Sequence, residues 1–269
     1  MNRLSDTMSQ NLNLLSVVIP ARDEAGCITA TLESIRQNLT PEAIPYEVIV
    51  VDDGSQDDTA AIVREYASRH DSVKIVFNHE RHGYGLAVRA GIEESTGDAI
   101  VVMMADGSDD AADIVKYAAK LKEGFDCVFG SRFVKGSKVV DYPLPKLALN
   151  RFANLFIRLL FRIGYNDITN AFKCYRKEVV RGLQPLISPH FNLTVEMPLK
   201  AIVRGYSYAV VPISWHNRKV GASKLRIKEM GSRYLFIVLY LWLEKHLARG
   251  DYHREIYSAG ADAAQLPHV

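Results

Sequence analysis

The stretch at residues 47–59, Glu-Val-Ile-Val-Val-Asp-Asp-Gly-Ser-Gln-Asp-Asp-Thr, decides the fold class. Its four consecutive β-branched residues at 48–51 are typical of a strand that is buried on both faces. Asp52 and Asp53 follow that strand, and the glycine and serine after them permit a tight turn into a helix. Ligands of open α/β sheets bind beyond the carboxyl ends of the strands, so both aspartates are placed where a ligand can reach them. The alternative is that these residues only form the turn and cap the helix.

The same pattern of apolar run, turn and helix continues on both sides of this stretch. Strands that alternate with helices of about ten to fifteen residues indicate right-handed βαβ units and a mainly parallel sheet. The expected strands lie at residues 14–19, 48–51, 73–77, 99–104 and 126–129, and the expected helices at about 25–37, 57–69, 86–94 and 111–122. The sequence therefore predicts an α/β fold for its first half.

The composition is that of an ordinary globular protein with a sizeable core, since 48% of the 269 residues are hydrophobic and 24% are charged. A net charge of +2 is too small to indicate a nucleic-acid partner. Basic residues are nevertheless enriched in the second half, which suggests an anionic partner there. The three widely spaced cysteines fit neither a metal site nor a disulfide framework and predict reduced thiols in the cytosol. The first dozen residues lack the apolar core of a signal peptide.

An amphipathic helix is expected at residues 147–163. At about 100° per residue, its polar side chains fall in one arc and its apolar side chains in the opposite arc. The members of the cationic polar arc are Lys146, Asn150, Arg151, Asn154, Arg158 and Arg162. These charges exclude a bilayer-spanning helix. One interpretation is a surface helix packed on the sheet, and the one we favour is a helix that lies on an anionic membrane surface.

A second apolar segment, at residues 234–243, has the sequence Tyr-Leu-Phe-Ile-Val-Leu-Tyr-Leu-Trp-Leu. A membrane span needs about 20 such residues, so this segment is too short to cross a bilayer. It fits either an interfacial anchor with aromatic residues at the headgroups or a buried contact between subunits.

Further polar residues follow the other predicted strands. The first strand leads into Asp23 and Glu24, whose carboxylates can accept hydrogen bonds from a base or a ribose. The fourth strand leads into Asp106, and more side-chain oxygens follow at Ser108 and at positions 109–110. Such a cluster suits Mg²⁺ or Mn²⁺, which are held by one or two carboxylates together with substrate phosphate oxygens. For the aspartates at 109–110, helix capping is the competing interpretation.

A glycine-containing loop, Arg81-His82-Gly83-Tyr84-Gly85, separates the third strand from its helix. Glycines at a helix start let backbone N–H groups approach a phosphate. This loop does not follow the first strand, as a dinucleotide-binding fingerprint does, and the sequence has no Walker lysine pattern. Both observations argue against a dehydrogenase and against a P-loop nucleotidase.

Taken in order, these segments resemble glycosyltransferase family 2, and within it the dolichol-phosphate mannosyltransferase-like group of polyprenyl-phosphate glycosyltransferases. The resemblance extends over about residues 14–230 and implies a GT-A-type nucleotide-sugar-binding fold. The matching segments are Val-Val-Ile-Pro-Ala-Arg-Asp-Glu at 17–24, Val-Asp-Asp-Gly-Ser at 51–55, Gly-Tyr-Gly-Leu-Ala at 83–87, Ala-Asp at 105–106, Gly-Ser-Arg-Phe at 130–133, Arg-Phe-Ala-Asn at 151–154, Thr-Asn-Ala-Phe-Lys-Cys-Tyr-Arg at 169–176, and Arg218 to Gly221 with Ser223 and Lys224.

The resemblance also implies substrates and residue roles. It implies a GDP- or UDP-sugar donor, a polyisoprenyl phosphate acceptor and a divalent cation, Mg²⁺ or Mn²⁺. Asp106 and Arg132 would be catalytic, and Asp106 and Ser108 would hold the metal. The residues implied at the nucleotide sugar are Pro20, Ala21, Arg22, Glu24, Asp52, Asp53, Gly83, Ala105 and Asp106. Those implied at the acceptor phosphate are Arg132, Arg151, Arg218, Ser223 and Lys224.

The chain departs from the family pattern at the end of the fourth strand. The family usually has Asp-Ala-Asp there, whereas this chain has Met104-Ala105-Asp106. The third metal-facing position, often glutamine, is Ser108. One carboxylate is therefore missing, which leaves the metal affinity and the identity of the ion open. The Gln-x-x-Arg-Trp pattern of processive synthases is also missing, since Trp215 follows a serine, and this argues against polymer synthesis.

A phosphate acceptor simplifies the expected chemistry. A phosphate monoester has a second pKa of about 6, so at neutral pH it is already a nucleophilic dianion and needs no general base. The enzyme then has to position two anions and neutralise their repulsion, with in-line attack at the anomeric carbon and inversion. A soluble or glycan hydroxyl is the alternative acceptor, and it would need a base such as Asp109, Asp110 or Glu196. A non-catalytic nucleotide-sugar-binding subunit is the third interpretation.

The expected organisation has a flexible N-terminus at 1–13, a catalytic domain at 14–230, an apolar interfacial or oligomerisation helix at 231–250 and a tail at 251–269. Within the domain, residues 14–130 would hold the nucleotide sugar and residues 131–230 the acceptor. We expect a cytoplasmic protein bound peripherally at the inner face of the membrane. Homo-oligomerisation through the apolar helix is the open alternative.

Overall fold

The computed structural model describes residues 12–79, 81–217 and 227–254. In the first half, strands alternate with helices as the apolar runs predict. These elements are β1 (Leu15–Ala21), α1 (Ile28–Leu39), β2 (Tyr46–Asp52), α2 (Thr59–Ala67), β3 (Val73–Phe77), α3 (Tyr84–Glu93), β4 (Ala99–Val102), α4 (Ala112–Lys122) and β5 (Cys127–Ser131). Every strand and helix expected for this half is present, with bounds that shift by a few residues.

The second half contributes shorter strands and the longest helices. These elements are β6 (Lys138–Val140), α5 (Leu144–Phe161), β7 (Lys173–Arg176), α6 (Lys177–Gly182), α7 (Leu193–Val203), β8 (Tyr208–Pro212), β9 (Ser214–His216) and α8 (Ile227–Leu247). The amphipathic helix expected at 147–163 corresponds to α5, and the apolar segment at 234–243 lies within α8.

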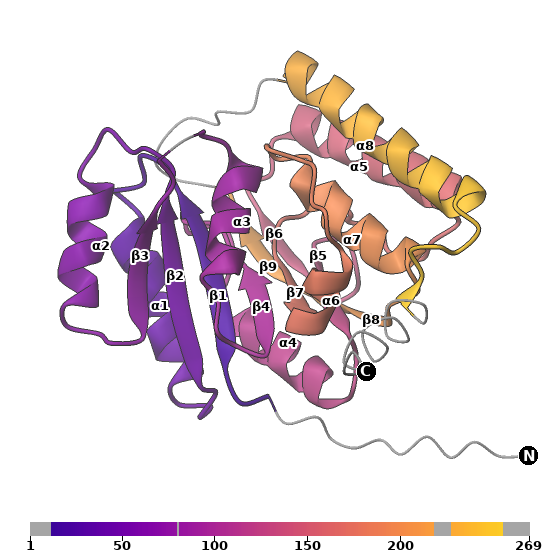
Figure 1. Cartoon of the computed structure of the whole chain (residues 1–269). Coiled ribbons are helices and arrows are strands. Elements are labelled where there is room, and N and C mark those ends of the chain that lie inside the picture. The colour runs from indigo at the N-terminus through magenta and orange to yellow at the C-terminus, as the bar shows by residue number, and fades with distance from the viewer. Residues whose placement is uncertain (1–11, 80, 218–226, 255–269) are drawn as a thin grey trace, which may run out of the picture.

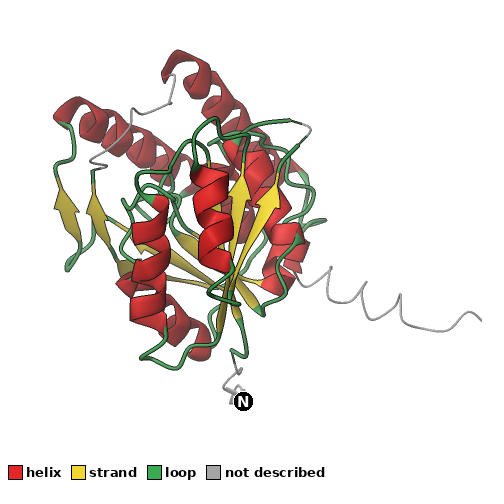
Figure 2. Cartoon of the chain, turned by 90° about the vertical axis from the view of Figure 1, so that its left-hand side faces the viewer, coloured by secondary structure: helices red, strands yellow, loops and turns green. Residues whose placement is uncertain are grey.

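The described residues form a seven-stranded sheet with the order β3-β2-β1-β4-β7-β5-β8. Helices cover both faces of this sheet, and β6 and β9 pair in a small separate sheet (Figures 1 and 2). The neighbouring strands are parallel except at β7, which runs antiparallel to both β4 and β5. The prediction of a mainly parallel α/β sheet is therefore confirmed.

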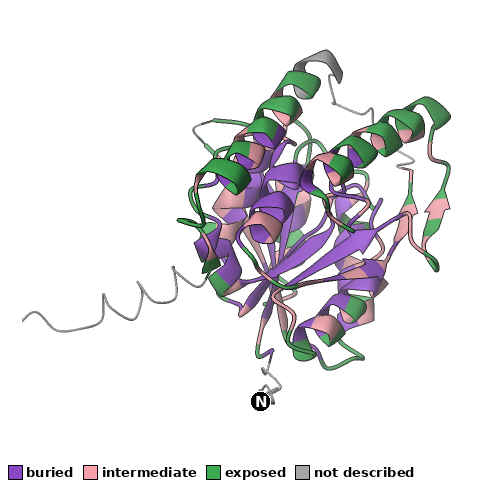
Figure 3. Cartoon of the chain, turned by 90° about the vertical axis from the view of Figure 1, so that its right-hand side faces the viewer, coloured by how far each residue is buried: buried purple, intermediate pink, exposed green. Residues whose placement is uncertain are grey.

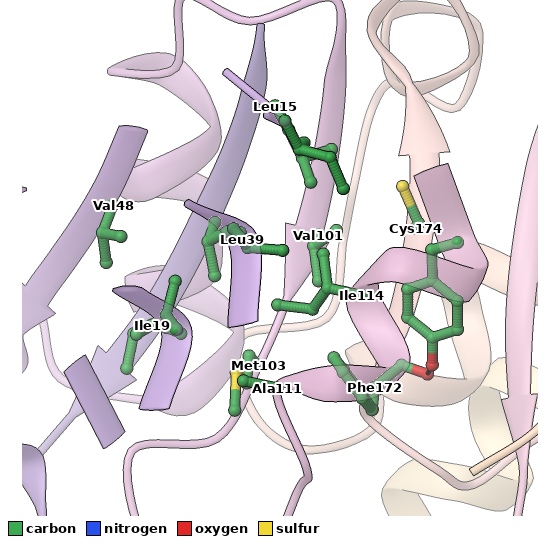
Figure 4. Packing of buried hydrophobic residues seen from close by; sticks show 14 of the residues in the cluster. Leu15, Ile19, Leu39, Val48, Val101, Met103, Ala111, Ile114, Phe172 and Cys174 are labelled. Carbon is green, nitrogen blue, oxygen red and sulfur yellow. Dashed lines mark hydrogen bonds between the residues drawn. The ribbon is translucent and has the colours of Figure 1, made fainter. Parts of the chain in front are cut away.

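Strands β1, β2 and β4 are mostly apolar because helices cover the sheet on both sides. All seven residues of β1 are buried, and its apolar side chains contribute to two apolar clusters, one on each face of the sheet. Val17 and Ile19 belong to the cluster that includes α1 and α4, whereas Val18 belongs to the cluster that includes α3 and α7. Figure 4 shows part of the first cluster, including Val101 and Ile114. Each such aliphatic side chain contributes about 1.5–3 kcal/mol on burial.

The carboxyl ends of β1, β2 and β4 lie along one edge of the sheet. Ala21 at the end of β1 pairs with Asp52 at the end of β2, and Val102 at the end of β4 pairs with Val18 of β1. The fourth strand is shorter than the predicted 99–104, because the backbone N–H of Met104 donates to the Asp109 carboxylate at 3.1 Å and not to a strand. The residues after Val102 therefore form a polar loop along this edge.

Helices α5 and α8 lie side by side at one end of the molecule (Figure 1). The polar arc of α5 is turned partly inward, where the buried Asn154 amide donates to Asn150 and Thr169. Most of its apolar arc faces away from the protein, and Phe152 is 71% exposed. Ile157 and Phe161 are buried in the cluster that includes α3 and α7, so the C-terminal half of α5 packs on the protein, and the membrane-surface interpretation stays a prediction.

Helix α8 has a buried side and an exposed apolar side. Ile237, Val238 and Leu241 are buried in the core, while large apolar side chains point outward between them. Figure 3 shows the outward sides of both helices as mostly exposed. We call the following residues the apolar surface: Leu149, Phe152, Leu155, Phe156 and Leu159 of α5, with Leu235, Phe236, Leu239 and Leu243 of α8. Among the described helices, none combines the length and the apolar character that crossing a membrane requires.

Candidate active site

The ends of β1 and β2 bring Pro20 and Ala21 close to Asp52 and Asp53, all four of which were predicted to bind the nucleotide sugar. The backbone N–H of Asp53 donates to the carbonyl of Ala21 at 2.8 Å, which holds Pro20 and Ala21 beside the two aspartates. The next loop is fixed to the start of α2, since the Glu24 N–H donates to the Thr59 hydroxyl at 2.8 Å. The structure thus places residues 20–24 and 52–53 at one edge of the sheet, as the sequence predicts.

Asp52 and Asp53 differ in what they can do. The Asp53 carboxylate is already committed, because it accepts the Asn78 amide at 2.7 Å and the Gly83 N–H at 2.8 Å. The Oδ1 atom of Asp52 is buried and accepts no hydrogen bond within the described residues. A buried acceptor without a donor costs about 1–3 kcal/mol, so a ligand that supplies an N–H would stabilise this site. Asp52 can therefore accept a hydrogen bond from a ligand, and its predicted contact with the nucleoside stays a prediction.

The glycines at the start of α3 allow another loop to pack closely. Gly83 donates its N–H to Asp53, and Gly85 donates its N–H to the Pro189 carbonyl at 3.0 Å. A side chain at Gly85 would overlap the Ser188 carbonyl oxygen. The structure gives these glycines a packing role, and a phosphate contact at Gly83 stays a prediction.

We expect Gly85→Ala to lower the free energy of unfolding by about 1–3 kcal/mol, because the added methyl group meets backbone that cannot move freely. The higher helix propensity of alanine, about 1 kcal/mol, does not offset this overlap. Gly164→Ala is the matched control, since a Cβ there meets nothing within 4 Å. Urea unfolding of both variants measures the difference, and equal midpoints would contradict the packing role.

The loop after β4 brings three oxygen-bearing side chains together. Asp106, Ser108 and Asp109 are all buried, and the Asp106 carboxylate accepts the Ser108 N–H at 3.0 Å. Burial, together with the negative charge of Asp106, raises the pKa of Asp109 to about 7. Asp110 instead accepts the Ala112 N–H at 3.0 Å at the start of α4. The helix-capping interpretation therefore holds for Asp110 and not for Asp109.

This donor set fits a hard divalent cation. Within the described residues, no group of three or more His, Cys, Asp or Glu side chains could hold a metal by itself. Two carboxylates and a hydroxyl, Asp106, Asp109 and Ser108, match Mg²⁺ or Mn²⁺ that completes its coordination with substrate phosphate oxygens and water. From the sequence, Asp106 and Ser108 were predicted to hold the metal, and the role of Asp109 was left open. The reason is that the family pattern places the second carboxylate at position 104.

Arg132, at the end of β5, is held by a carboxylate that sequence reasoning missed. Its Nε and Nη2 atoms donate to the two oxygens of Asp167 at 2.9 and 2.7 Å, and its backbone N–H donates to the same carboxylate at 2.9 Å. Burial alone would lower the pKa of Arg132, but the charge and hydrogen bonds of Asp167 raise it. Asp167 lies 35 residues away and no local pattern marks it, so only the fold reveals the pair.

Aromatic rings surround the Arg132 guanidinium and connect it to Arg151. The guanidinium carbon of Arg132 lies 5.4 Å from the centre of the Phe133 ring, and that of Arg151 lies 4.4 Å from the same ring. Tyr142 and Trp215 also lie within 6 Å of Arg132. The structure thus places Arg132 and Arg151, two of the residues predicted to bind the acceptor phosphate, beside the same Phe133 ring.

The remaining predicted acceptor residues, Arg218, Ser223 and Lys224, lie outside the described residues. Glu196, one of the alternative bases, is fully engaged: it pairs with Lys200 at 2.6 Å and accepts the N–H groups of Ile187 and Ser188. All three alternative bases make structural contacts, but Asp109 is the one that is buried beside Asp106 and Ser108 in the loop after β4.

Comparison with known proteins identifies the family to which the sequence is similar. Residues 16–183 match the family described as Glycosyl transferase family 2. Polyprenol monophosphomannose synthase of Mycolicibacterium smegmatis is 33% identical over 184 residues, which are 66% of this chain and 69% of that protein. Dolichol-phosphate mannosyltransferase of Pyrococcus furiosus is 34% identical over 218 residues, which are 80% of this chain and 60% of that protein. The chain thus spans less than two thirds of the second relative.

Solved structures share the fold at lower identity. Glucosyl-3-phosphoglycerate synthase from Mycobacterium tuberculosis, in complex with Mn²⁺, UDP and glucosyl-3-phosphoglycerate, has a TM-score of 0.61 and 18% identity, over 87% of this chain and 80% of that chain. The same enzyme with Mn²⁺, UDP and phosphoglyceric acid has a TM-score of 0.60 and 19% identity, over 87% of this chain and 78% of that chain. These similarities identify the fold as GT-A. Together with the family match over more than half of the sequence, they lead to one conclusion: the chain belongs to glycosyl transferase family 2 and is a glycosyltransferase.

Proposed function

We propose that the protein transfers a sugar from a GDP- or UDP-sugar to the phosphate of a polyisoprenyl phosphate at the cytoplasmic face of a membrane. The observation that carries this proposal is the pair of guanidinium groups, Arg132 and Arg151, that both lie close to the Phe133 ring just after β5. Arg151 belongs to α5, whose outer side carries the apolar surface. The names of the two relatives, which specify polyprenol or dolichol phosphate, support the same acceptor class.

The donor half of the reaction is assigned to the edge formed by β1, β2 and β4. Asp52, with its unpaired buried oxygen, would accept an N–H of the base, and residues 20–24 would enclose the nucleoside. Asp106, with Ser108 and Asp109 beside it, would hold Mg²⁺ or Mn²⁺. When bound, such an ion neutralises the diphosphate and makes it a better leaving group.

The acceptor half is assigned to the arginines. A phosphate dianion needs no general base at neutral pH, so the residues have to position it and offset the repulsion between two anions. Asp167 holds the guanidinium group of Arg132 in one orientation. Charge-assisted hydrogen bonds from a fixed guanidinium group are stronger and more directional than those from a lysine. This arrangement favours in-line attack at the anomeric carbon with inversion.

Asp109 supports a second candidate, in which the acceptor is a hydroxyl group. A buried carboxyl with a pKa of about 7 is suited to act as a general base. The two candidates differ in the role of Asp109: a metal ligand for a phosphate acceptor, and a proton acceptor for a hydroxyl. The apolar surface beside Arg151 favours the lipid phosphate.

A comparison of two acceptors with the same isoprenoid chain tests the proposal. Purified protein is incubated with Mn²⁺ or Mg²⁺, a nucleotide sugar, and either a short polyprenyl phosphate or the corresponding polyprenol. We expect transfer to the phosphate and at least about 100-fold slower transfer to the alcohol, because the alcohol lacks the charges that the arginines bind. Faster transfer to the alcohol or to a soluble sugar would favour the hydroxyl candidate.

The apolar surface supports peripheral binding to a membrane. Its leucine and phenylalanine side chains come from two helices that lie side by side, and exposed apolar patches of this kind mark interaction sites. Arg151 of α5, Arg162 directly after α5 and Lys245 of α8 are exposed, so that cations accompany the apolar side chains. Apolar insertion combined with cations is how interfacial helices bind anionic bilayers.

We expect the double substitution Phe152→Ser and Phe236→Ser to weaken flotation with anionic liposomes by at least about tenfold, since two large side chains lose their burial in lipid. Ile187→Ser, which removes an exposed apolar side chain outside α5 and α8, is the control. If the double variant floats like the wild type but elutes as a smaller species in size-exclusion chromatography, the apolar surface is a subunit contact.

A further inference from the structure

We propose that Lys173 is a positioning residue for the two acceptor arginines, because its ammonium group holds the loop that orients both of them. This inference rests on the proposed function, in which Arg132 and Arg151 bind the acceptor phosphate. Lys173 is the first residue of β7 and is only 1% exposed. Lysine is rarely buried this completely unless its charge and its N–H groups have partners. The loop comprises residues 165–172, between α5 and β7, and we call it the acceptor loop.

The acceptor loop holds Arg132 and the residues on both sides of it. The Asp167 carboxylate of the loop accepts hydrogen bonds from the Nε, Nη2 and backbone N–H groups of Arg132. The Asn166 amide donates to the Phe133 carbonyl at 2.9 Å and accepts from the Ser131 hydroxyl at 2.6 Å. The position of residues 131–133 therefore depends on the position of the loop.

The same loop holds α5, the helix that carries Arg151. The Thr169 hydroxyl accepts the Asn150 amide at 2.7 Å and the Asn154 amide at 3.0 Å, and the Thr169 N–H donates to the Asn154 side-chain oxygen at 3.3 Å. Arg151 directly follows Asn150, so these bonds fix the helix turn that presents Arg151. A shift of the acceptor loop would therefore move both guanidinium groups.

Lys173 ties the acceptor loop to α7. Its Nζ atom donates to the carbonyls of Ile168, at 3.0 Å, and of Asn170, which flank Thr169 in the loop. It also donates to the carbonyl of Thr194 in α7 at 3.3 Å. An ammonium group has three N–H donors, and these three carbonyls use all of them. One buried cation thus joins the loop to a helix of the core.

Helix α7 needs this donor because it contains Pro198. In a regular helix the Thr194 carbonyl would accept the N–H of residue 198, and proline has no N–H to donate. Thr194 is buried, and a buried carbonyl without a donor is unfavourable. Lys173 supplies the missing donor, so the point at which the loop is attached to α7 is fixed by the sequence of the helix.

The charge of Lys173 adds to its role at the acceptor site. Burial lowers the pKa of Lys173 to about 7, whereas the negative charge of Asp167 raises it. Arg132 and Asp167 together carry no net charge, so this pair alone attracts a phosphate only weakly. Protonated Lys173 restores a positive net charge to the group. A neutral side chain of similar length would therefore not replace it fully.

The test compares Lys173→Met, Lys173→Arg and a control, Val180→Ala, with farnesyl phosphate as the acceptor, Mn²⁺, and the GDP- or UDP-sugar that the wild type uses. Lys173→Met should raise the KM for farnesyl phosphate at least about tenfold, since both arginines lose their fixed positions, and should leave the KM for the nucleotide sugar within about twofold of the wild type. Lys173→Arg keeps a cation with several donors, and a cavity of about 10 Å³ beside Lys173 gives it room. Its KM values should stay within about threefold of those of the wild type.

Val180 is buried in the apolar cluster that includes α7, but it lies in α6, outside the acceptor loop. Val180→Ala should lower the urea midpoint and leave both KM values unchanged, which is the result of a purely structural loss. The same result for Lys173→Met would overturn the positioning role. If Lys173→Met does not fold, Lys173→Gln, which keeps two N–H donors without the charge, takes its place: a KM for farnesyl phosphate raised at least about threefold supports the role, and a wild-type KM overturns it.

A measurement that needs no turnover separates this inference from the proposed function. The Nε–H of Arg132 is bonded to Asp167 in a buried pair, so its NMR signal, assigned by its absence in Arg132→Lys, should exchange slowly with solvent. We expect exchange at least about tenfold faster in Lys173→Met and a wild-type rate in Val180→Ala. Faster exchange in a protein that transfers no sugar to farnesyl phosphate would leave the positioning of Arg132 standing and remove the proposed function. Unchanged exchange in Lys173→Met, with an active wild type, would overturn the inference while the transferase proposal stands.

Discussion

Replacing Asp106 with asparagine is expected to lower sugar transfer by at least about 100-fold, because a charged group that acts on the diphosphate is worth that much in the transition state. The free energy of unfolding should change little. The Asp106 carboxylate accepts the Ser108 N–H at 3.0 Å, and an asparagine carbonyl can accept the same bond. Initial rates over a range of Mn²⁺ concentrations, together with urea unfolding, measure both quantities.

Asp110→Asn is the matched control for Asp106, since Asp110 lies in the same loop but accepts an N–H at the start of α4. It should keep most of the activity. Direct Mn²⁺ binding, followed by electron paramagnetic resonance of the free ion, should be lost in Asp106→Asn and retained in Asp110→Asn. Wild-type metal dependence in Asp106→Asn would remove Asp106 from the proposed metal site.

Replacing Arg132 with alanine is expected to reduce both activity and stability. Activity should fall at least about tenfold, because a charge-assisted contact to a phosphoryl group is lost. Stability should fall by about 3–5 kcal/mol, since Asp167 is left as a buried carboxylate without its partner. Arg132→Lys should recover part of each, as lysine supplies the charge but not the bidentate fork. Steady-state kinetics and urea unfolding provide the two measurements.

The double variant Arg132→Ala with Asp167→Ala separates the two effects. Removing both charges leaves no unpaired ion, so the double variant should be more stable than Arg132→Ala alone. Its activity should stay as low as that of the single variant, because the contact to the acceptor is still missing. Recovery of activity together with stability would show that Arg132 is a structural residue only.

The first half of the fold was predictable because its strands are local apolar runs. The β-branched residues at 48–51 and the matching run at 15–19 are each buried on both faces, and the turn residues after them mark where the strands end. Glu24, Asp52, Asp53 and Asp106 were predicted as site residues from the rule that ligands bind at those strand ends, whereas the roles predicted for Pro20, Ala21 and Gly83 came from the resemblance to the family. The motifs and their order along the chain were enough to predict the family.

The second half was less predictable because its structure depends on long-range contacts. Strand β7 inserts antiparallel between β4 and β5, although its four residues include Lys173 and Arg176 and have no apolar pattern. Helix α5 packs inward through amide contacts to Thr169 as well as through the buried Ile157 and Phe161, a combination that its polar and apolar arcs alone do not predict. Asp167 likewise becomes significant only because the fold places it at Arg132. None of these partners is close in sequence.

The central claim, transfer of a sugar to a lipid phosphate, is tested most directly by the identity of the product. Purified protein with a divalent cation is incubated with undecaprenyl phosphate and a panel of labelled GDP- and UDP-sugars, and the organic phase is analysed by mass spectrometry. The account predicts, for at least one donor, a labelled lipid whose mass equals the lipid phosphate plus one sugar residue, formed by the wild type and not by Asp106→Asn. Label that stays in the aqueous phase with every donor, or a glycoside of an alcohol in place of a phosphodiester, would contradict it.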